Sequence, residues 1–375
     1  MSPAKHNTRV REAIALVAAL VLVSACSGTR GVAPKRDSTS VHLDAASAVR
    51  LVEVKRIAPD PADAADTDSA SPVVALAFAP NDAELTSAHY TGRVRTIDWQ
   101  AGKVVANLTL TYLSAMATEF DDAGSVLVTA AGNLPTASMY ATLEEVQAWR
   151  MRDGRALLKS VPTFRSQAIA VSLDGQLVWE GFGSEAYLND IANDKRRDEL
   201  FSMWEETTED HTIDALAIDN QKQYLAAVTR SGKLAIGGFG ANTVAQYQDR
   251  SKMPYYIDAA KGKYALALKF DPLGDRLAML TTHNVLVFNL KLRSMQHVFT
   301  LIKPINMGKL AFNADGTLLV LASDNGVQIL DVAHMREIKT LYTGPTYALA
   351  FNHAQTRIAF GDAKGTVHVW GMPTS

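Results

Sequence analysis

The sequence predicts an all-β protein, a single seven-bladed β-propeller built from four-stranded blades. Three observations support this fold class: a short apolar segment returns seven times, its copies lie 39 to 52 residues apart, and turn residues recur at matching places within each repeat. A repeat of about 40 to 45 residues with four strands is typical of propeller blades. The chain of 375 residues therefore fits one large domain after its N-terminal segment.

The first strand of each repeat alternates small and large apolar residues and closes on a large one. Clear copies are Ala75-Leu76-Ala77-Phe78 and Ala348-Leu349-Ala350-Phe351. The seven closing residues are Phe78, Phe120, Val171, Ile218, Phe270, Phe312 and Phe351. We expect these strands to line the narrow centre of the ring, where small and large side chains must alternate to fit the taper.

Turn residues separate the other strands of each repeat. Asp174-Gly175 and Asn313-Ala314-Asp315-Gly316 follow first strands, and Thr91-Gly92 and Lys364-Gly365 follow second strands. Glycine, asparagine and aspartate tolerate the positive φ angles of tight hairpins. This spacing predicts a meander of four antiparallel strands in each blade.

The third strands carry a further family signal in Ile97-Asp98-Trp99 and in Thr366-Val367-His368-Val369-Trp370. Together with the repeat length, they resemble the WD40 β-propeller family over about four-fifths of the chain. The family's Trp-Asp order is reversed at Asp98-Trp99 and its Gly-His pair before the first strand is missing. The resemblance therefore implies a WD40-like fold without the family's Asp-His hydrogen-bond tetrad in most blades.

The last repeat ends after its third strand, because Trp370 lies five residues before the C-terminus. Residues 48–57 alternate well enough to form a strand. We expect this N-terminal strand to complete the last blade as its outer strand, so that the ring closes and few free edges remain. The predicted propeller domain is 48–375.

The N-terminus has the features of an export signal. Lys5, Arg9 and Arg11 precede an apolar run over 13–23, which is too short to span a bilayer as a helix. The run ends in Val23-Ser24-Ala25-Cys26, which resembles the lipobox of bacterial lipoproteins. The resemblance implies a signal peptide over 1–25, cleavage between Ala25 and Cys26, and acylation of Cys26. An ordinary secretory signal is the alternative.

Cys26 is the single cysteine of the chain, so no internal disulfide can form. Two or three acyl chains hold a protein stably on a membrane, and the Ser, Gly, Ala and charged residues over 26–47 predict a flexible tether. Ser27 follows the cysteine where an Asp favours retention in the inner membrane of Gram-negative cells. We therefore expect a lipid-anchored protein of the outer membrane that faces the periplasm.

Charge and motifs exclude several classes of function. The formal net charge is −2 and the predicted signal removes three basic residues, so there is no basic excess to bind nucleic acid. The nine histidines show no ligand spacing, and no metal or cofactor is expected. Ser323-Asp324-Asn325 lacks the companion motifs of serine enzymes, and Gly181-Phe182-Gly183-Ser184-Glu185-Ala186 lacks a βαβ context. We expect both to be hairpins, and we expect no catalytic residues.

The remaining candidates are loops that depart from the compact repeat. They contain Met139 and Tyr140 in repeat two, Trp204 after repeat three, and Tyr255 and Tyr256 after repeat four. Aromatic residues and Met are typical of protein-recognition surfaces, although they could simply cover the blades beneath them. The sequence favours a non-enzymatic scaffold or adaptor that binds an envelope protein through this face. The alternatives are an enzyme or small-ligand binder that uses the central channel, and a quinoprotein-like propeller in outer-membrane protein assembly.

Overall fold

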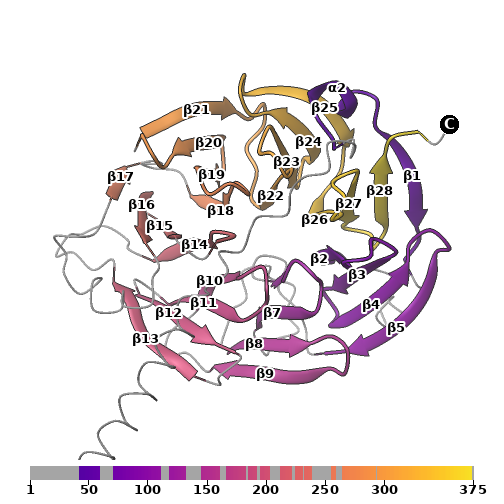
Figure 1. Ribbon diagram of the computed structural model, residues 1–375, viewed down its shortest axis with the longest axis horizontal. Coiled ribbons are helices and arrows are strands. Elements are labelled where there is room, and N and C mark those ends of the chain that lie inside the picture. The colour runs from indigo at the N-terminus through magenta and orange to yellow at the C-terminus, as the bar shows by residue number, and fades with distance from the viewer. Residues whose placement is uncertain are drawn as a thin grey trace, which may run out of the picture. The chain divides into compact units, whose positions relative to one another are not determined.

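The computed structural model contains seven four-stranded antiparallel sheets arranged in a ring, which confirms the predicted seven-bladed β-propeller (Figure 1). Residues 42–375 form one unit. The structure describes residues 42–59, 71–110, 118–131, 145–160, 166–182, 185–191, 195–202, 212–221, 224–230, 232–238, 255–258, 264–292 and 294–373. Within these residues, no helix is long and apolar enough to cross a membrane.

Each blade is a meander whose first strand lies at the centre of the ring and whose fourth strand lies at the rim. Blade one consists of β2(Val73–Phe78), β3(Glu84–His89), β4(Arg93–Asp98) and β5(Lys103–Thr109). Blade two consists of β6(Thr118–Phe120), β7(Val126–Ala131), β8(Glu145–Arg150) and β9(Arg155–Ser160). Blade three consists of β10(Ser166–Val171), β11(Leu177–Phe182), β12(Glu185–Asp190) and β13(Lys195–Ser202). Blade four consists of β14(Ile213–Ile218), β15(Tyr224–Thr229), β16(Lys233–Gly238) and β17(Tyr255–Asp258). Blade five consists of β18(Ala265–Phe270), β19(Arg276–Thr281), β20(Asn284–Asn289) and β21(Ser294–Thr300). Blade six consists of β22(Gly308–Phe312), β23(Leu318–Ser323), β24(Gly326–Asp331) and β25(Arg336–Tyr342).

The N-terminal strand β1(Val52–Ile57) completes the last blade, as the sequence predicts. It pairs antiparallel with β28(Val367–Gly371), and the sheet continues through β27(Arg357–Asp362) to the inner strand β26(Thr346–Phe351). The first and last strands of the described unit therefore share one sheet, which gives the last blade four strands like the others.

The folded unit begins at His42, six residues before the predicted boundary. Leu43 is 1% exposed, and the short helix α2(Ala45–Ala48) starts at Asp44, whose carboxylate accepts a hydrogen bond from the Ser47 amide at 2.7 Å. The residues expected to be the end of a tether and the start of a strand are instead a capped helical turn. Leu43, Ala48 and Leu51 insert into the apolar core between the last two blades, and this packing holds the helical turn in place.

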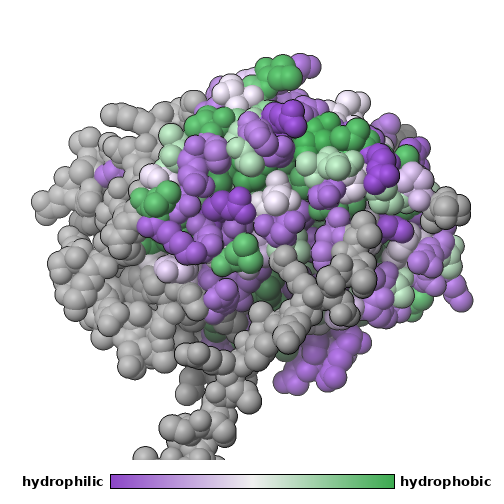
Figure 2. Space-filling model, turned by 45° about the horizontal axis from the view of Figure 1, so that its top comes forward, coloured by the Kyte–Doolittle hydropathy of each residue, from purple (hydrophilic) through white to green (hydrophobic). Residues whose placement is uncertain are grey.

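The hydrophobic core lies between adjacent blades. Between blade seven and blade one, for example, Val369 and Ala348 pack with Phe78, Leu76 and Trp99. In β27, Gly361 approaches blade one so closely that a Cβ atom would lie 2.3 Å from the Cβ of Val73. This position therefore requires glycine. Figure 2 shows that the apolar patches on the displayed surface are separated by polar side chains.

The disc has two faces, because connections alternate from side to side in an antiparallel meander. We call the side with the first-to-second and third-to-fourth strand connections the turn face; in blade five it holds 271–275 and 290–292. The other side holds second-to-third connections and the links between blades, and we call it the loop face; in blade five it holds Thr282, His283 and 301–307.

A buried polar residue fixes most turns after the inner strand. It follows the closing apolar residue, and its side-chain oxygen accepts a hydrogen bond from the backbone amide five residues later. The pairs are Asp121 with Val126, Ser172 with Leu177, Asp219 with Tyr224, Asp271 with Arg276, Asn313 with Leu318, and Asn352 with Arg357. Blade one has Ala79 at this position and uses a different arrangement.

Candidate functional site

The predicted lipid site and three of the five predicted face residues lie outside the described residues. These are Ala25 and Cys26, and Met139, Tyr140 and Trp204. Met139 and Tyr140 fall between β7 and β8, and Trp204 follows β13, so in the chain they occupy connections that belong to the loop face. Their binding role stays a prediction.

Tyr255 and Tyr256 have a different place from the one expected. They belong to β17, the outer strand of blade four, where their backbones pair with Ile236 and Ala235. The long excursion of this repeat lies before β17 rather than after it, and Tyr-Tyr-Ile is a strand-forming sequence. These residues are therefore part of the blade's rim and not of a link between blades.

The described part of the loop face carries two exposed apolar side chains that sequence reasoning missed. Ile302 is 88% exposed and Tyr264 is 57% exposed. Both border the same hairpin of blade five, because the Thr282 amide donates to the Tyr264 carbonyl and the Leu301 amide donates to the His283 carbonyl. The link 301–307 that contains Ile302 also holds Leu301, Ile305 and Met307, so the sequence does not mark Ile302 as the exposed one.

Two register positions of the inner strands, two residues apart on the same side of each strand, are mostly alanine. The residue before the closing one is Ala77, Ala170, Ala217, Ala311 and Ala350 in five blades, but Glu119 and Lys269 in the others. The residue three positions before the closing residue is Ala75, Ala168, Ala215, Ala267 and Ala348, but Lys309 in blade six. Three charged residues thus stand where the other described blades have alanine.

These charges meet across the channel. The Lys269 ammonium lies 3.4 Å from a Glu119 carboxylate oxygen, and the Lys309 ammonium donates to the Thr118 carbonyl at 3.4 Å. Burial lowers the pKa of Lys309 from its usual value; Glu119 partly offsets this effect and Lys269 adds to it. Blades five and six therefore bring two ammonium groups to β6 of blade two, one to the Glu119 carboxylate and one to the Thr118 carbonyl.

A cavity of about 320 Å³ surrounds this cluster. Its wall includes Phe120, Phe270 and Phe312 besides the three charged residues. It also reaches the turn face, where the turn residues Asp122, Leu173, Asn220, Pro272 and Ala314 form part of its lining. Its volume is at the low end of the range for small-molecule pockets, about 300 to 1,000 Å³.

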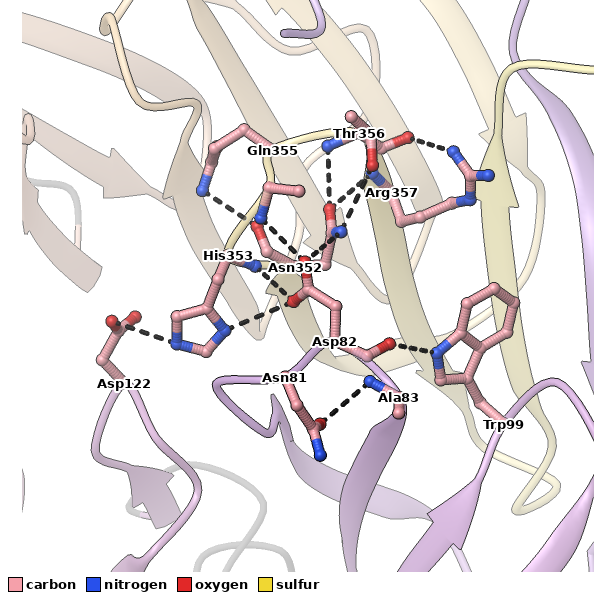
Figure 3. A network of polar contacts seen from close by, with 11 residues as sticks. Asn81, Asp82, Ala83, Trp99, Asp122, Asn352, His353, Gln355, Thr356 and Arg357 are labelled. Carbon is pink, nitrogen blue, oxygen red and sulfur yellow. Dashed lines mark hydrogen bonds and ion pairs between the residues drawn. The ribbon is translucent and has the colours of Figure 1, made fainter. Parts of the chain in front are cut away.

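A polar latch joins the last blade to the first on the turn face (Figure 3). The Asp82 carboxylate accepts hydrogen bonds from the Asn352 side chain at 2.9 Å and from the amides of His353 and Ala354 at 2.7 and 2.8 Å. The His353 ring lies 3.4 Å from both Asp82 and Asp122. This network ties the turns of blades seven and one together and accounts for these polar residues structurally.

Both suspected enzyme motifs are hairpins, as expected. Ser323 and Gly326 pair at the end of β23 and β24, with Asp324 and Asn325 forming the turn. Phe182 and Glu185 likewise pair at the end of β11 and β12. Among the described residues, no group of three His, Cys, Asp or Glu side chains is placed to hold a metal ion.

Comparisons with known proteins add no family to this picture. No protein-family profile matches the chain, and no curated protein matches its sequence. The function is therefore inferred from the fold and from the described side chains.

Proposed function

We propose that the protein is a non-enzymatic interaction scaffold, anchored by lipid in the bacterial cell envelope, that binds an envelope protein through its loop face. The observation that carries this proposal is the closed ring of seven four-stranded blades, which supports exposed connections on a rigid disc. Functional residues often lie on loops that a rigid scaffold positions. An outer-membrane location facing the periplasm is part of the proposal and is supported by Cys26 and Ser27 in the sequence.

The exposed pair on blade five supplies candidate contacts on this face. Tyr264 and Ile302 flank the Thr282-His283 hairpin, so apolar and polar groups lie together on the loop face. Tyrosine and other large side chains surrounded by polar groups are typical of protein-recognition surfaces. In the chain, Met139 and Tyr140 fall between β7 and β8 of blade two and Trp204 follows β13 of blade three, so we assign them to connections of the same face. Tyr255 and Tyr256 are left out because they lie in β17.

In-cell cross-linking followed by mass spectrometry tests the scaffold function. We expect the native protein to capture an envelope protein that is lost when Met139, Tyr140, Trp204, Tyr264 and Ile302 are changed to Ala. The matched control is Leu292→Ala, which removes a side chain that is 69% exposed on the turn face of blade five. The proposal fails if the loop-face variant, still folded, captures the same protein as the control.

The anchor has its own test. Cys26→Ala removes the thiol that would carry the lipid, so we expect an uncleaved precursor that does not incorporate labelled fatty acid. Lipid-labelled protein of mature size from this variant would show that Cys26 is not the acylation site.

A further inference from the structure

We propose that the central channel is a binding site for a small organic anion, held through a carboxylate or phosphate group between Lys269 and Lys309. This site goes beyond the scaffold function and does not depend on it. The first argument is the alanine pattern of the inner strands. Since five blades have alanine at the first position and five of the six described blades have it at the second, the fold does not need charged side chains there.

The second argument is the charge of the cluster. Two ammonium groups face one carboxylate, and desolvation of such charges is costly unless they are paired. Two further carboxylates line the cavity near its turn-face end, but they have other partners. Asp121 accepts hydrogen bonds from the amide and the hydroxyl of Ser125 and from the Val126 amide, and Asp122 lies beside His353. A bound anion would therefore compensate the second ammonium.

The third argument is hydrogen-bonding capacity. An ammonium group has three donors. Lys309 makes its contact with the Thr118 carbonyl and Lys269 with Glu119, both at the long distance of 3.4 Å. The two groups therefore keep donors for a ligand oxygen. Charge-assisted hydrogen bonds to carboxylate or phosphate oxygens are about twice as strong as neutral ones.

The cavity defines the size and character of the ligand. Its volume of about 320 Å³ admits a small metabolite, and Phe120, Phe270 and Leu310 in its wall can pack against a carbon skeleton. Entry from the turn face passes Leu173 and Pro272. Carboxylates and phosphates both present anionic oxygens that the two ammonium groups can bind. The test below decides which of these two classes of ligand the site takes.

Isothermal titration of the full chain with inorganic phosphate, succinate and the uncharged analogue succinamide tests the site. We expect at least one anion to bind and succinamide not to bind. Lys309→Ala and Lys269→Ala place the residue that other blades already have, so the fold should persist, which circular dichroism checks. Each variant removes a charge-assisted contact and should weaken binding about tenfold or more.

Glu119→Ala provides the opposing control. It removes the carboxylate that competes for Lys269, so we expect several-fold tighter binding of the same anion. Binding of phosphate alone, or of succinate alone, supports the site and identifies its ligand class. The proposal is overturned if neither anion binds, or if the two lysine variants bind the anion as tightly as the native chain.

Discussion

At the scale of single residues, Asp82 shows how a position that favours glycine is used to join two blades. Its φ angle is +55°, in the left-handed region, and the equivalent turn positions in four other blades are Gly124, Gly175, Gly274 and Gly316. A non-glycine residue in this region costs roughly 1 to 2 kcal/mol. The three hydrogen bonds that the Asp82 carboxylate accepts from blade seven offset this strain.

We expect Asp82→Gly to destabilise the protein, although glycine relaxes the backbone there. The lost hydrogen bonds involve a charged acceptor and each contribute about 1.5 to 3 kcal/mol, so the net loss should be about 2 kcal/mol or more. Urea unfolding measures this change. Gln355→Gly is the matched control, because Gln355 has φ +56° and its side-chain amide donates a hydrogen bond to the Asn352 carbonyl at 3.2 Å. An equal or smaller loss for Asp82→Gly than for Gln355→Gly would contradict a latch role.

The charged residues of the channel are present in the inner-strand repeats, but they stand out only when the repeats are aligned position by position. Lys269 interrupts Ala267-Leu268-Lys269-Phe270, and Glu119 occupies the same position in Thr118-Glu119-Phe120. Motif searches look for neighbouring chemical groups, whereas these two residues are 150 positions apart. Ring closure brings them to 3.4 Å, so their pairing is a property of the fold.

At the scale of elements, the inner strands and their turns could be predicted because both signals are local. Alternation placed the inner strand of the last blade at 348–351, within β26, the Lys364-Gly365 turn follows β27 as predicted, and the missing outer strand of the last repeat predicted β1. The outer strand β17 was missed because a long excursion separates it from β16. The segment before β1 was also missed, since Leu43, Ala48 and Leu51 are spread mostly among alanine and polar residues without the alternation of a strand.

The segment 42–51 should contribute strongly to stability. Leu43 is buried between the last two blades, its amide donates to the Gln355 carbonyl at 3.0 Å, and the Asn313 side chain donates to its carbonyl at 2.8 Å. We expect Leu43→Ala to cost about 2 to 5 kcal/mol in the free energy of unfolding. Val49→Ala, a side chain that is 58% exposed, is the matched control and should change it by less than about 0.5 kcal/mol. Similar unfolding curves for the two variants would place Leu43 outside the core.

At the scale of the whole molecule, ionised side chains reinforce the backbone pairing of β1 with blade seven. The His368 ring lies 2.6 Å from Glu53 and 3.4 Å from Asp362, and Arg56 donates two hydrogen bonds to Glu53. Burial raises the pKa of Glu53, but hydrogen bonds from Arg56 and His368 outweigh it and lower the pKa below its usual value. The pKa of Asp362 is likewise lowered, by His368 and by the Thr366 and Lys364 amides against the effect of burial.

These lowered pKa values imply that acid weakens the closure. The stabilisation is present above the pKa of the unfolded carboxyls, near 4, and is lost as the pH falls through the lower folded values. We expect the urea midpoint to fall as the pH is lowered from about 5 to 3, and Glu53→Gln to make this dependence shallower. If native protein and Glu53→Gln lose stability in parallel over this range, Glu53 does not contribute to the acid sensitivity.

The most direct test of the scaffold function compares the two faces of one blade. A photo-cross-linking amino acid is placed either at Ile302 on the loop face or at Leu292 on the turn face, both exposed in blade five. The protein is irradiated in cells, and the captured partners are identified by mass spectrometry. We expect a defined envelope protein to be captured from position 302 and not from position 292. Capture of the same proteins from both positions, or of none from position 302, would contradict the proposed binding face.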